Sequence, residues 1–197
     1  MQNPDDLREK LCRAMKAARQ TSSDFDLNPD LALPDRPALK QAAVLVAVTE
    51  DAQLILTKRS TRLKHHPGQI AFPGGRRDDT DRDLVHTALR EAEEEIGLNP
   101  QDVSVLGELP YHETVTNYVA TPIVGIVPSD LQYKAEAGEV AEIFTVPLLH
   151  VMSVANFAIE GRHWQGARRH YYTVPYGPYY IWGATARMLR GLAEQWT

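Results

Sequence analysis

A single cysteine, Cys12, occurs among the 197 residues of the chain, and no long hydrophobic run is present. One cysteine excludes an internal disulfide and a cysteine-rich zinc site, and it suits a reducing cytoplasm. The longest apolar run, residues 42–48, is far shorter than the ~20 residues that cross a bilayer. The polar, acidic N-terminus lacks the apolar core of a signal peptide. The sequence therefore predicts a cytoplasmic protein with no membrane partner.

The chain has no excess of positive charge, since 21 Lys and Arg stand against 26 Asp and Glu, giving a formal net charge of −5 and a sequence pI of about 5.8. The chain lacks the broad basic surface of a nucleic-acid-binding protein, so no nucleic-acid partner is expected. An anionic small-molecule substrate would need local cations or a bound metal. With 43% hydrophobic and 24% charged residues, the composition is typical of one globular domain.

Apolar periodicity divides the chain into an N-terminal arm and a main domain. Residues 5–19 carry Leu7 and Leu11 at helical spacing, so we expect a surface helix there. Prolines and acidic residues follow this segment, which indicates a linker. We therefore expect an arm over residues 1–37, made of the helix and a proline-containing linker, and a main domain over residues 38–197.

The main domain alternates short apolar strands with few helices. Residues 42–49 and 54–58 predict a hairpin, because a short polar stretch separates two β-branched, apolar runs. Further strands are expected over residues 69–72, 103–109, 119–127 and 140–147, a second hairpin over 157–159 and 169–174, a helix over 84–96 ended by Gly97, and a segment over 180–195 that begins as a strand and finishes as a helix. Strands outnumber helices, which indicates an α+β fold with a mixed sheet.

The helix expected over residues 84–96 distributes its carboxylates unevenly. At 100° per residue its apolar side chains form one stripe centred on Ala92. Glu93 falls on one flank, whereas Arg90 can pair with Glu94 one turn further along the other. The stripe comprises Val85, Ala88, Leu89, Ala92 and Ile96, and the carboxylates gathered on the second flank are Glu91, Glu94 and Glu95.

Three carboxylates on one flank repel one another, and like charges one turn apart destabilise a helix. A divalent cation such as Mg²⁺ or Mn²⁺ would remove this repulsion, because these hard ions prefer carboxylate oxygen. A solvated acidic face is the alternative. The preceding segment Phe72-Pro73-Gly74-Gly75 predicts a tight turn whose glycines let the backbone approach a ligand closely. This turn favours the cation site.

An acidic helix entered through a glycine turn resembles the Nudix box, G-x5-E-x7-R-E-U-x-E-E-x-G-U, of hydrolases that act on nucleoside diphosphates linked to another group. The second half of the box matches throughout, from Arg90 to Leu98. The first half departs, because the sixth residue after Gly75 is Asp81 instead of Glu and lies one residue too far from Arg90. The role of Asp81 is left open by this departure.

The upstream residues resemble a second signature, carried by the coenzyme A pyrophosphatase branch of the Nudix superfamily. Its pattern L-L-T-x-R-S-x3-R-x3-G-x3-F-P-G-G matches residues 55–75, with Ile55 in place of Leu and Lys64 in place of Arg. The resemblance extends over residues 40–195. The branch pattern G-G-x-x-D-x-x-D is also present, at Gly74, Gly75, Asp78 and Asp81.

This resemblance implies a Nudix fold over residues 38–197, an α/β/α sandwich with a mixed β-sheet and a loop-helix-loop catalytic motif. It implies metal-dependent hydrolysis of the pyrophosphate bond of coenzyme A, and of acyl derivatives, to adenosine 3′,5′-bisphosphate and 4′-phosphopantetheine, with Mg²⁺ or Mn²⁺ as cofactor. The implied catalytic residues are Glu91, Glu94, Glu95 and Arg90, the implied metal ligands are Glu91, Glu94, Glu95 and the Gly74 carbonyl, and the implied substrate-binding residues are Arg59, Lys64, Gly74 and Gly75.

A local basic cluster precedes the glycine turn in this acidic chain, formed by Lys58, Arg59, Arg62 and Lys64. Such side chains could hold a phosphate, including the 3′-phosphate that coenzyme A carries besides its diphosphate. A solvated strand end is the alternative.

Several points stay open in the sequence. The group that takes the proton from water is Glu91, Glu113, Glu139 or Glu142. Trp182 and the tyrosines near it either stack on adenine or belong to the core. ADP-ribose or NADH is the alternative substrate, and a catalytically silent binding module is a third interpretation. The chain acts either alone or as a homodimer.

Overall fold

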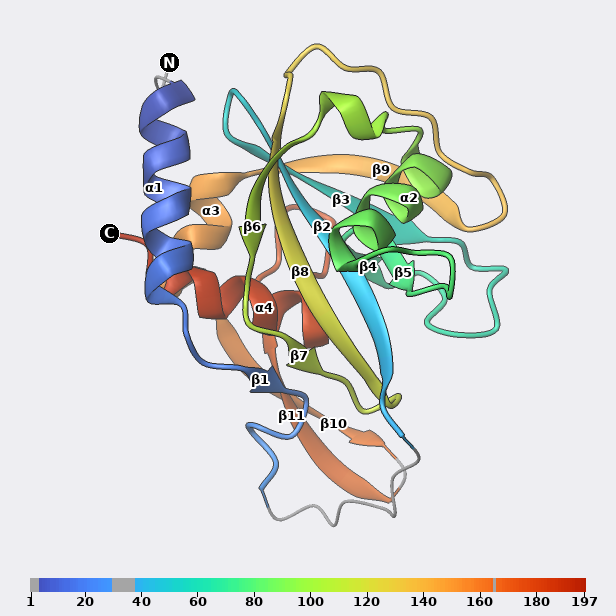
Figure 1. The fold of residues 1–197 in the computed structure, drawn as a ribbon. Coiled ribbons are helices and arrows are strands. Elements are labelled where there is room, and N and C mark those ends of the chain that lie inside the picture. Colours follow the sequence, from blue (N-terminus) through green and yellow to red (C-terminus); the bar gives the residue numbers. More distant parts are fainter. Residues whose placement is uncertain (1–3, 30–37, 165) are drawn as a thin grey trace.

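The computed structural model describes residues 4–29, 38–164 and 166–197. Within these residues a nine-stranded mixed sheet is covered by α2 on one face and by α1, α3 and α4 on the other (Figure 1). The helices are α1 (Pro4–Ala17), α2 (Leu84–Ile96), α3 (Leu148–Met152) and α4 (Gly183–Ala193), with 3₁₀ turns at Pro100–Asp102 and Val154–Asn156. The expected α/β/α sandwich is confirmed. No described helix is long and apolar enough to cross a membrane.

The sheet follows the order β1-β7-β8-β2-β3-β4, and β5, β6 and β9 pair with β2, β8 and β3. The parallel strands β2 and β8 lie at its centre, buried between the helical layers, which explains the continuous apolar run of residues 42–48. The separate hairpin β10/β11 projects below the sheet in Figure 1. The strands are β1 (Ser22–Ser23), β2 (Lys40–Thr49), β3 (Gln53–Arg59), β4 (Ile70–Ala71), β5 (Gly74–Arg76), β6 (Ser104–Glu108), β7 (His112–Glu113), β8 (Tyr118–Val127), β9 (Val140–Pro147), β10 (Ala158–Trp164) and β11 (Ala167–Thr173).

Each face of the sheet has its own apolar core. The core under α2 is rich in alanine, so the helix can lie close to the sheet. Ala92 is fully buried, as the periodicity of the helix predicts, whereas Val85 and Leu89 are only partly buried. The core under α2 includes Ala43, Leu45, Ala47, Ala88, Ala92 and Ile96, and the opposite core includes Leu7, Leu11, Val46, Val48, Leu148 and Leu189.

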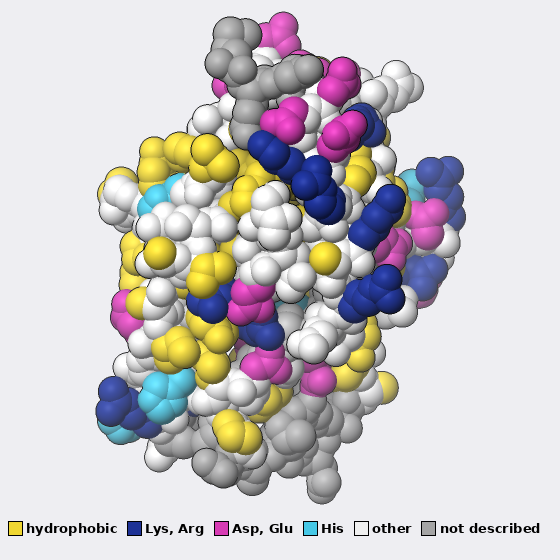
Figure 2. Space-filling view, turned by 90° about the vertical axis from the view of Figure 1, so that its left-hand side faces the viewer, with side chains coloured by type: hydrophobic (Ala, Val, Ile, Leu, Met, Phe, Trp, Pro, Cys, Tyr) yellow, Lys and Arg dark blue, Asp and Glu magenta, His cyan; other side chains and the backbone are white. Residues whose placement is uncertain are grey.

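The expected surface helix, α1, contributes to the second core. Leu7 and Leu11 are fully buried there. In the view of Figure 2, which faces the α1 side, hydrophobic side chains lie among charged side chains of both signs. Residues 22–28, which we call the strap, follow α1 and pair with β7 through β1. The linker expected after α1 lies partly, at residues 30–37, outside the described residues.

Helix α2 begins and ends where the sequence predicts. The carboxylate of Asp83 caps its N-terminus by accepting the N–H of His86 at 2.7 Å. Gly97 ends it with a φ of 68°, a left-handed conformation that favours glycine, and donates its N–H to the carbonyl of Glu93 at 2.9 Å. These caps fix the position of the helix's glutamates along the sheet.

The prediction of a strand at the start of residues 180–195 is wrong. The residues before α4 make only isolated bridges, such as the one between Thr173 and Trp182. Pro175 and Pro178 lack a backbone N–H and interrupt a strand ladder. The short elements β1, β5, β7 and α3 were not expected, because so few residues carry no periodicity.

Candidate active site

Strand β5 carries the glycine turn and lies between β2 and α2. Gly74 is opposite Val44 of β2 and has a φ of 153°, and a Cβ there would overlap the carbonyl oxygen of Ala43. A Cβ on Gly75 would lie 2.5 Å from the carboxylate of Glu91. The two glycines therefore allow the acidic helix to contact the backbone of β5 directly.

Glu95, one turn after Glu91, reaches the same strand. Its Oε2 accepts the N–H of Gly74 at 3.1 Å, and the residue is only 4% exposed. Burial raises the pKa of Glu95 to about 7, because the Gly74 hydrogen bond and the charge of Arg59 only partly offset desolvation. Burial also raises the pKa of Glu91, although its pairing with Arg90 opposes this change. The carboxylates of Glu91 and Glu95 thus lie against β5, and neighbouring cations and hydrogen bonds offset only part of the cost of burying their negative charge.

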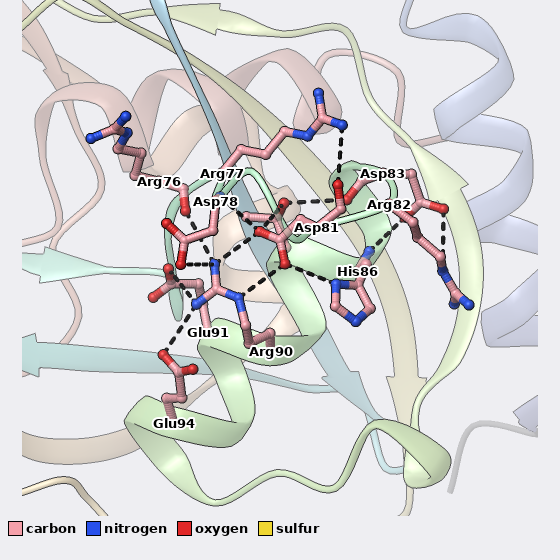
Figure 3. A network of polar contacts seen from close by, with 11 residues as sticks. Arg76, Arg77, Asp78, Asp81, Arg82, Asp83, His86, Arg90, Glu91 and Glu94 are labelled. Carbon is pink, nitrogen blue, oxygen red and sulfur yellow. Dashed lines mark hydrogen bonds and ion pairs between the residues drawn. The ribbon is translucent and has the colours of Figure 1, made fainter.

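Arg90 lies at the centre of a polar network on the same helix (Figure 3). Its guanidinium makes two hydrogen bonds to Asp81, Nε to Oδ1 and Nη2 to Oδ2, both of 3.0 Å. Nη1 lies 3.0 Å from the carboxylate of Glu91 and 3.1 Å from that of Glu94. The hydrogen bond with Asp81 is the largest cause that raises the pKa of Arg90. Arg90 therefore holds two of the three carboxylates of the acidic flank.

Asp81 lies in the loop just before α2, anchors this network and is 2% exposed. Besides the guanidinium of Arg90, it accepts the hydroxyl of Thr87 and the N–H of Asp78, each at 2.9 Å. His86 Nδ1 lies 2.8 Å from its Oδ1. The bond to Arg90, more than any other contact, holds the pKa of Asp81 well below its usual value. Asp81 thus ties the loop after β5 to the first turns of α2.

The three flank carboxylates do not form a preassembled metal site. The described part of the chain contains no group of three or more His, Cys, Asp or Glu side chains that could hold a metal ion. Glu94, with a side chain 60% exposed, pairs with Arg90 instead. The donor set nevertheless fits a hard divalent cation in kind, because it consists of carboxylate oxygens. Glu91 also raises the pKa of Glu95 by repulsion, which a cation would relieve.

Arg59, at the end of β3, brings the upstream signature to the acidic helix. Its Nη1 lies 3.8 Å from Oε1 of Glu95. Its Nε is buried and has no hydrogen-bond partner. A guanidinium N–H without a partner can donate a hydrogen bond to an anion. The first part of the branch signature, at Arg59, therefore meets the second half of the Nudix box, at Glu95.

The rest of the basic cluster is divided. Lys58 precedes Arg59 on β3, so strand alternation directs it toward the opposite face of the sheet, where it is in register with Glu142 of β9. Lys64 lies exposed in the loop of residues 60–69. The basic cluster expected from the sequence is therefore divided: Arg59 faces the acidic helix, Lys58 faces the opposite side of the sheet, and Lys64 lies in the loop.

The alternatives for the proton acceptor occupy different places. Glu139 lies within electrostatic reach of Glu91 and Glu95 and raises the pKa of each. Its backbone is fixed, because its N–H donates to the carboxylate of Glu136 at 2.8 Å and its carbonyl accepts the N–H of Ser60 at 2.7 Å. Glu139 therefore lies near the two buried carboxylates of the acidic helix.

Glu142 and Glu113 have other surroundings. Glu142 accepts the hydroxyl of Tyr179 at 2.5 Å, and the ring of Tyr179 stacks on Phe144 with 3.6 Å between centroids. Glu113 lies on β7, which pairs with β1 of the strap. Tyr179 is thus part of the core, as one of the two sequence interpretations holds.

Comparisons with known proteins agree with the motifs. The family model of the NUDIX domain matches residues 39–169. A protein named uncharacterized Nudix hydrolase NudL from Cronobacter sakazakii is 44% identical over 158 residues, which cover 79% of this chain and 82% of that protein. A protein of the same name from Escherichia coli is 42% identical over 158 residues, which again cover 79% of this chain and 82% of that protein. Among solved structures, the MutT protein from Methanosarcina mazei Go1 matches with a TM-score of 0.47 and 22% identity, over 61% of this chain and 84% of that one.

Proposed function

The chain belongs to the Nudix family, whose members hydrolyse pyrophosphate bonds of nucleoside diphosphate derivatives, and from that premise we propose that its substrate is coenzyme A. The reaction cleaves the diphosphate into adenosine 3′,5′-bisphosphate and 4′-phosphopantetheine, and acyl derivatives are cleaved in the same way. The enzyme requires a divalent cation, which we propose to be Mg²⁺ or Mn²⁺.

The contact between Arg59 and Glu95 carries this proposal. The 3.8 Å ion pair joins the branch signature of residues 55–75 to the Nudix helix, so the two motifs belong to one site. The unpartnered Nε of Arg59 provides a cationic N–H beside the carboxylates. An anionic diphosphate carrying a further phosphate matches this combination of a carboxylate cation site and a neighbouring guanidinium.

The residues that would hold the cation are Glu91, Glu94, Glu95 and the Gly74 carbonyl. When bound, it supplies positive charge that offsets the diphosphate oxygens and lowers the pKa of water. Glu91 and Glu95 already lie against β5, and Glu94 must exchange its contact with Arg90 to join them. Arg90, oriented by Asp81, keeps the carboxylate of Glu91 in position.

Phosphoryl transfer needs positioning and charge stabilisation more than covalent catalysis. Glu139 takes the proton from the attacking water, because it lies near Glu91 and Glu95 and its backbone is held by hydrogen bonds. Glu142 is already bonded to Tyr179 and is less suited to that role. Arg59 and Lys64 bind the phosphates, with Lys64 reaching from the exposed loop.

Product identification tests the proposal. The protein is incubated with Mg²⁺ or Mn²⁺ and, in separate reactions, with coenzyme A, ADP-ribose and NADH, and the products are identified by mass spectrometry. We expect adenosine 3′,5′-bisphosphate and 4′-phosphopantetheine from coenzyme A as the fastest reaction. Faster cleavage of ADP-ribose or NADH would assign the site to another nucleoside diphosphate derivative, and no cleavage of any of them would contradict the proposal.

A further inference from the structure

A group of aromatic and charged side chains lies outside the acidic site, on one face of the hairpin β10/β11. Glu160 is opposite Tyr171, and Arg162 is opposite Arg169, so these four side chains share that face. Trp182, just before α4, packs edge-on against Tyr171 with 5.0 Å between ring centroids. We call Arg162, Tyr171, Tyr180 and Trp182 the aromatic shelf.

Tyr180 is exposed yet tightly held. Its ring is 41% exposed, and its hydroxyl donates to Glu160 Oε2 at 2.7 Å. The hydroxyl of Tyr171 lies 3.4 Å away, and the ring of Trp182 lies 6.5 Å from that of Tyr180. Fixing an exposed side chain costs rotamer entropy that burial does not recover here. A rigid, exposed aromatic ring is, however, well suited to bind a flat ligand.

Cations accompany these rings. The guanidinium of Arg162 lies over the ring of Trp182, 5.5 Å from its centroid. Arg169, on the same face, covers the ring of Phe25 at 5.2 Å. The face therefore combines π-surfaces with positive charge, which matches a heteroaromatic base attached to a phosphate.

The shelf lies next to the loop that leaves Arg59. A Cβ on Gly183, the residue after Trp182, would lie 3.8 Å from Nε2 of Gln69. The carbonyl of Gln69 accepts the N–H of Arg59 at 2.9 Å. A short path of direct neighbours thus connects the residue after Trp182 with the backbone of Arg59.

The strap closes the same region from another side. Asp24 of the strap lies within electrostatic reach of both Arg169 and His66, and His66 in turn lies within reach of Arg59. The side chain of Asn28 fixes the strap to β11 by hydrogen bonds to the N–H and carbonyl of His170, of 2.7 and 2.9 Å. The hairpin face and the loop of residues 60–69 therefore border one region.

We propose that the aromatic shelf binds the nucleobase of the substrate, an inference that rests on the proposed function. The base stacks on Tyr180 and Trp182 while Arg162 contacts its edge or an adjoining phosphate. Tyr171, Tyr180 and Trp182 follow the residues that match the family model, which end at residue 169. The rings that recognise the base thus follow the matched domain, Arg162 lies within it, and the acidic helix acts on the diphosphate.

Equilibrium binding in the presence of a metal chelator tests the shelf without turnover. The probes are the two halves of coenzyme A: adenosine 3′,5′-bisphosphate, which has a base, and 4′-phosphopantetheine, which has none. Tryptophan fluorescence should change with the first probe only, and Trp182→Phe should abolish the change although two other tryptophans remain. Tyr180→Ala should weaken binding of the bisphosphate about tenfold, and Tyr180→Phe should retain most of the affinity because the ring stays.

Tyr111→Ala is the matched control, since Tyr111 is a similarly exposed tyrosine that is not part of the shelf, and the affinity of this variant should equal that of the wild type. Three results would overturn the inference: no fluorescence change in the wild type, a change that persists in Trp182→Phe, or unchanged affinity in Tyr180→Ala. Binding of the bisphosphate without cleavage of coenzyme A would instead contradict the proposed function and leave the shelf in place.

Discussion

Asp81 and Arg90 form a two-point ion pair at the base of the acidic helix, with both N–O distances at 3.0 Å. The same guanidinium pairs with Glu91 and Glu94. The buried carboxylate of Asp81 therefore orients Arg90 and, through it, two of the proposed metal ligands. Asp81 occupies the position at which this chain departs from the general Nudix box. Asp81 contacts Arg90, and Arg90 in turn contacts the proposed metal ligands Glu91 and Glu94, so Asp81 acts on those ligands only through Arg90.

Asp81→Asn should destabilise the fold by about 3 kcal/mol, because removing one partner from a buried ion pair leaves the other charge uncompensated. The loss stays near the lower end of the usual range, since Glu91 and Glu94 still pair with Arg90. Urea unfolding measures it. Asp78→Asn is the control, because the Asp78 side chain is 4.0 Å from Arg90 and largely exposed, and an equal loss in both variants would contradict the anchoring role.

Substitutions along α2 separate its flanks. Glu94→Gln and Glu95→Gln should each lower kcat by roughly 10²–10⁴, because a lost anionic ligand weakens transition-state stabilisation. Glu93→Gln should leave kcat nearly unchanged, since Glu93 is exposed on the other flank. Steady-state kinetics at saturating Mg²⁺ compare the three. If Glu93→Gln reduced kcat as strongly as Glu94→Gln, the assignment of the acidic flank would be wrong.

Glu95 should make the metal-free protein less stable as the pH rises. Its pKa is raised to about 7 in the folded state, so folding favours the protonated form. The associated stability is fully present below the unfolded pKa near 4.5 and is lost as the pH rises through about 7. Thermal unfolding in a chelator at pH 5 and pH 8 should show a decrease in Tm that is smaller in Glu95→Gln.

Divalent cation should reverse this loss at pH 8, because binding to the folded state alone raises its stability. The measurement is the Tm of the wild type with and without Mg²⁺, and the Tm of Glu95→Gln under the same two conditions. Equal pH dependence in the two proteins, together with no effect of Mg²⁺ on the wild type, would contradict a cation site at Glu95.

The two glycines of β5 should respond differently to alanine. Gly74→Ala should lower Tm markedly, because the new Cβ would overlap the backbone of β2 and the φ of 153° strains an L-residue. Gly75→Ala should fold nearly as well, since the flexible carboxylate of Glu91 can move away, but its activity should fall. Tm and kcat/KM measured on both variants test this split, and a folded, active Gly74→Ala would contradict it.

Much of this arrangement could be predicted from the sequence. The bounds of α2 followed from its apolar period and from Gly97 at its C-terminus, which are local signals. The burial of Ala92 and the pairing of Arg90 with Glu94 followed from helical geometry alone. These features depend on residues within a few positions of one another.

The remaining features depend on contacts between distant residues. The bond from Asp81 to Arg90 requires the fold of the intervening loop, and the Arg59–Glu95 pair requires the packing of β3 against α2. The short strap strand β1 pairs with β7 far along the chain and has no periodic signal. The sequence left open whether the tyrosines near Trp182 stack on adenine or belong to the core, and a core position holds for Tyr179 but not for the exposed Tyr180.

Discrimination of the 3′-phosphate is the most direct test of the central claim that this site acts on coenzyme A. The measurement is kcat/KM for coenzyme A, its 3′-dephospho form and ADP-ribose, in the wild type, Arg59→Ala, Lys64→Ala and a distant control, Lys16→Ala. A charge-assisted contact contributes about 1.5–3 kcal/mol, so coenzyme A should be preferred over the dephospho form by roughly 10–100-fold. Lys64→Ala should reduce that preference with the dephospho rate retained, Arg59→Ala should also reduce it, and Lys16→Ala should change nothing. Equal kcat/KM for coenzyme A and its dephospho form, or a higher value for ADP-ribose, would contradict the account.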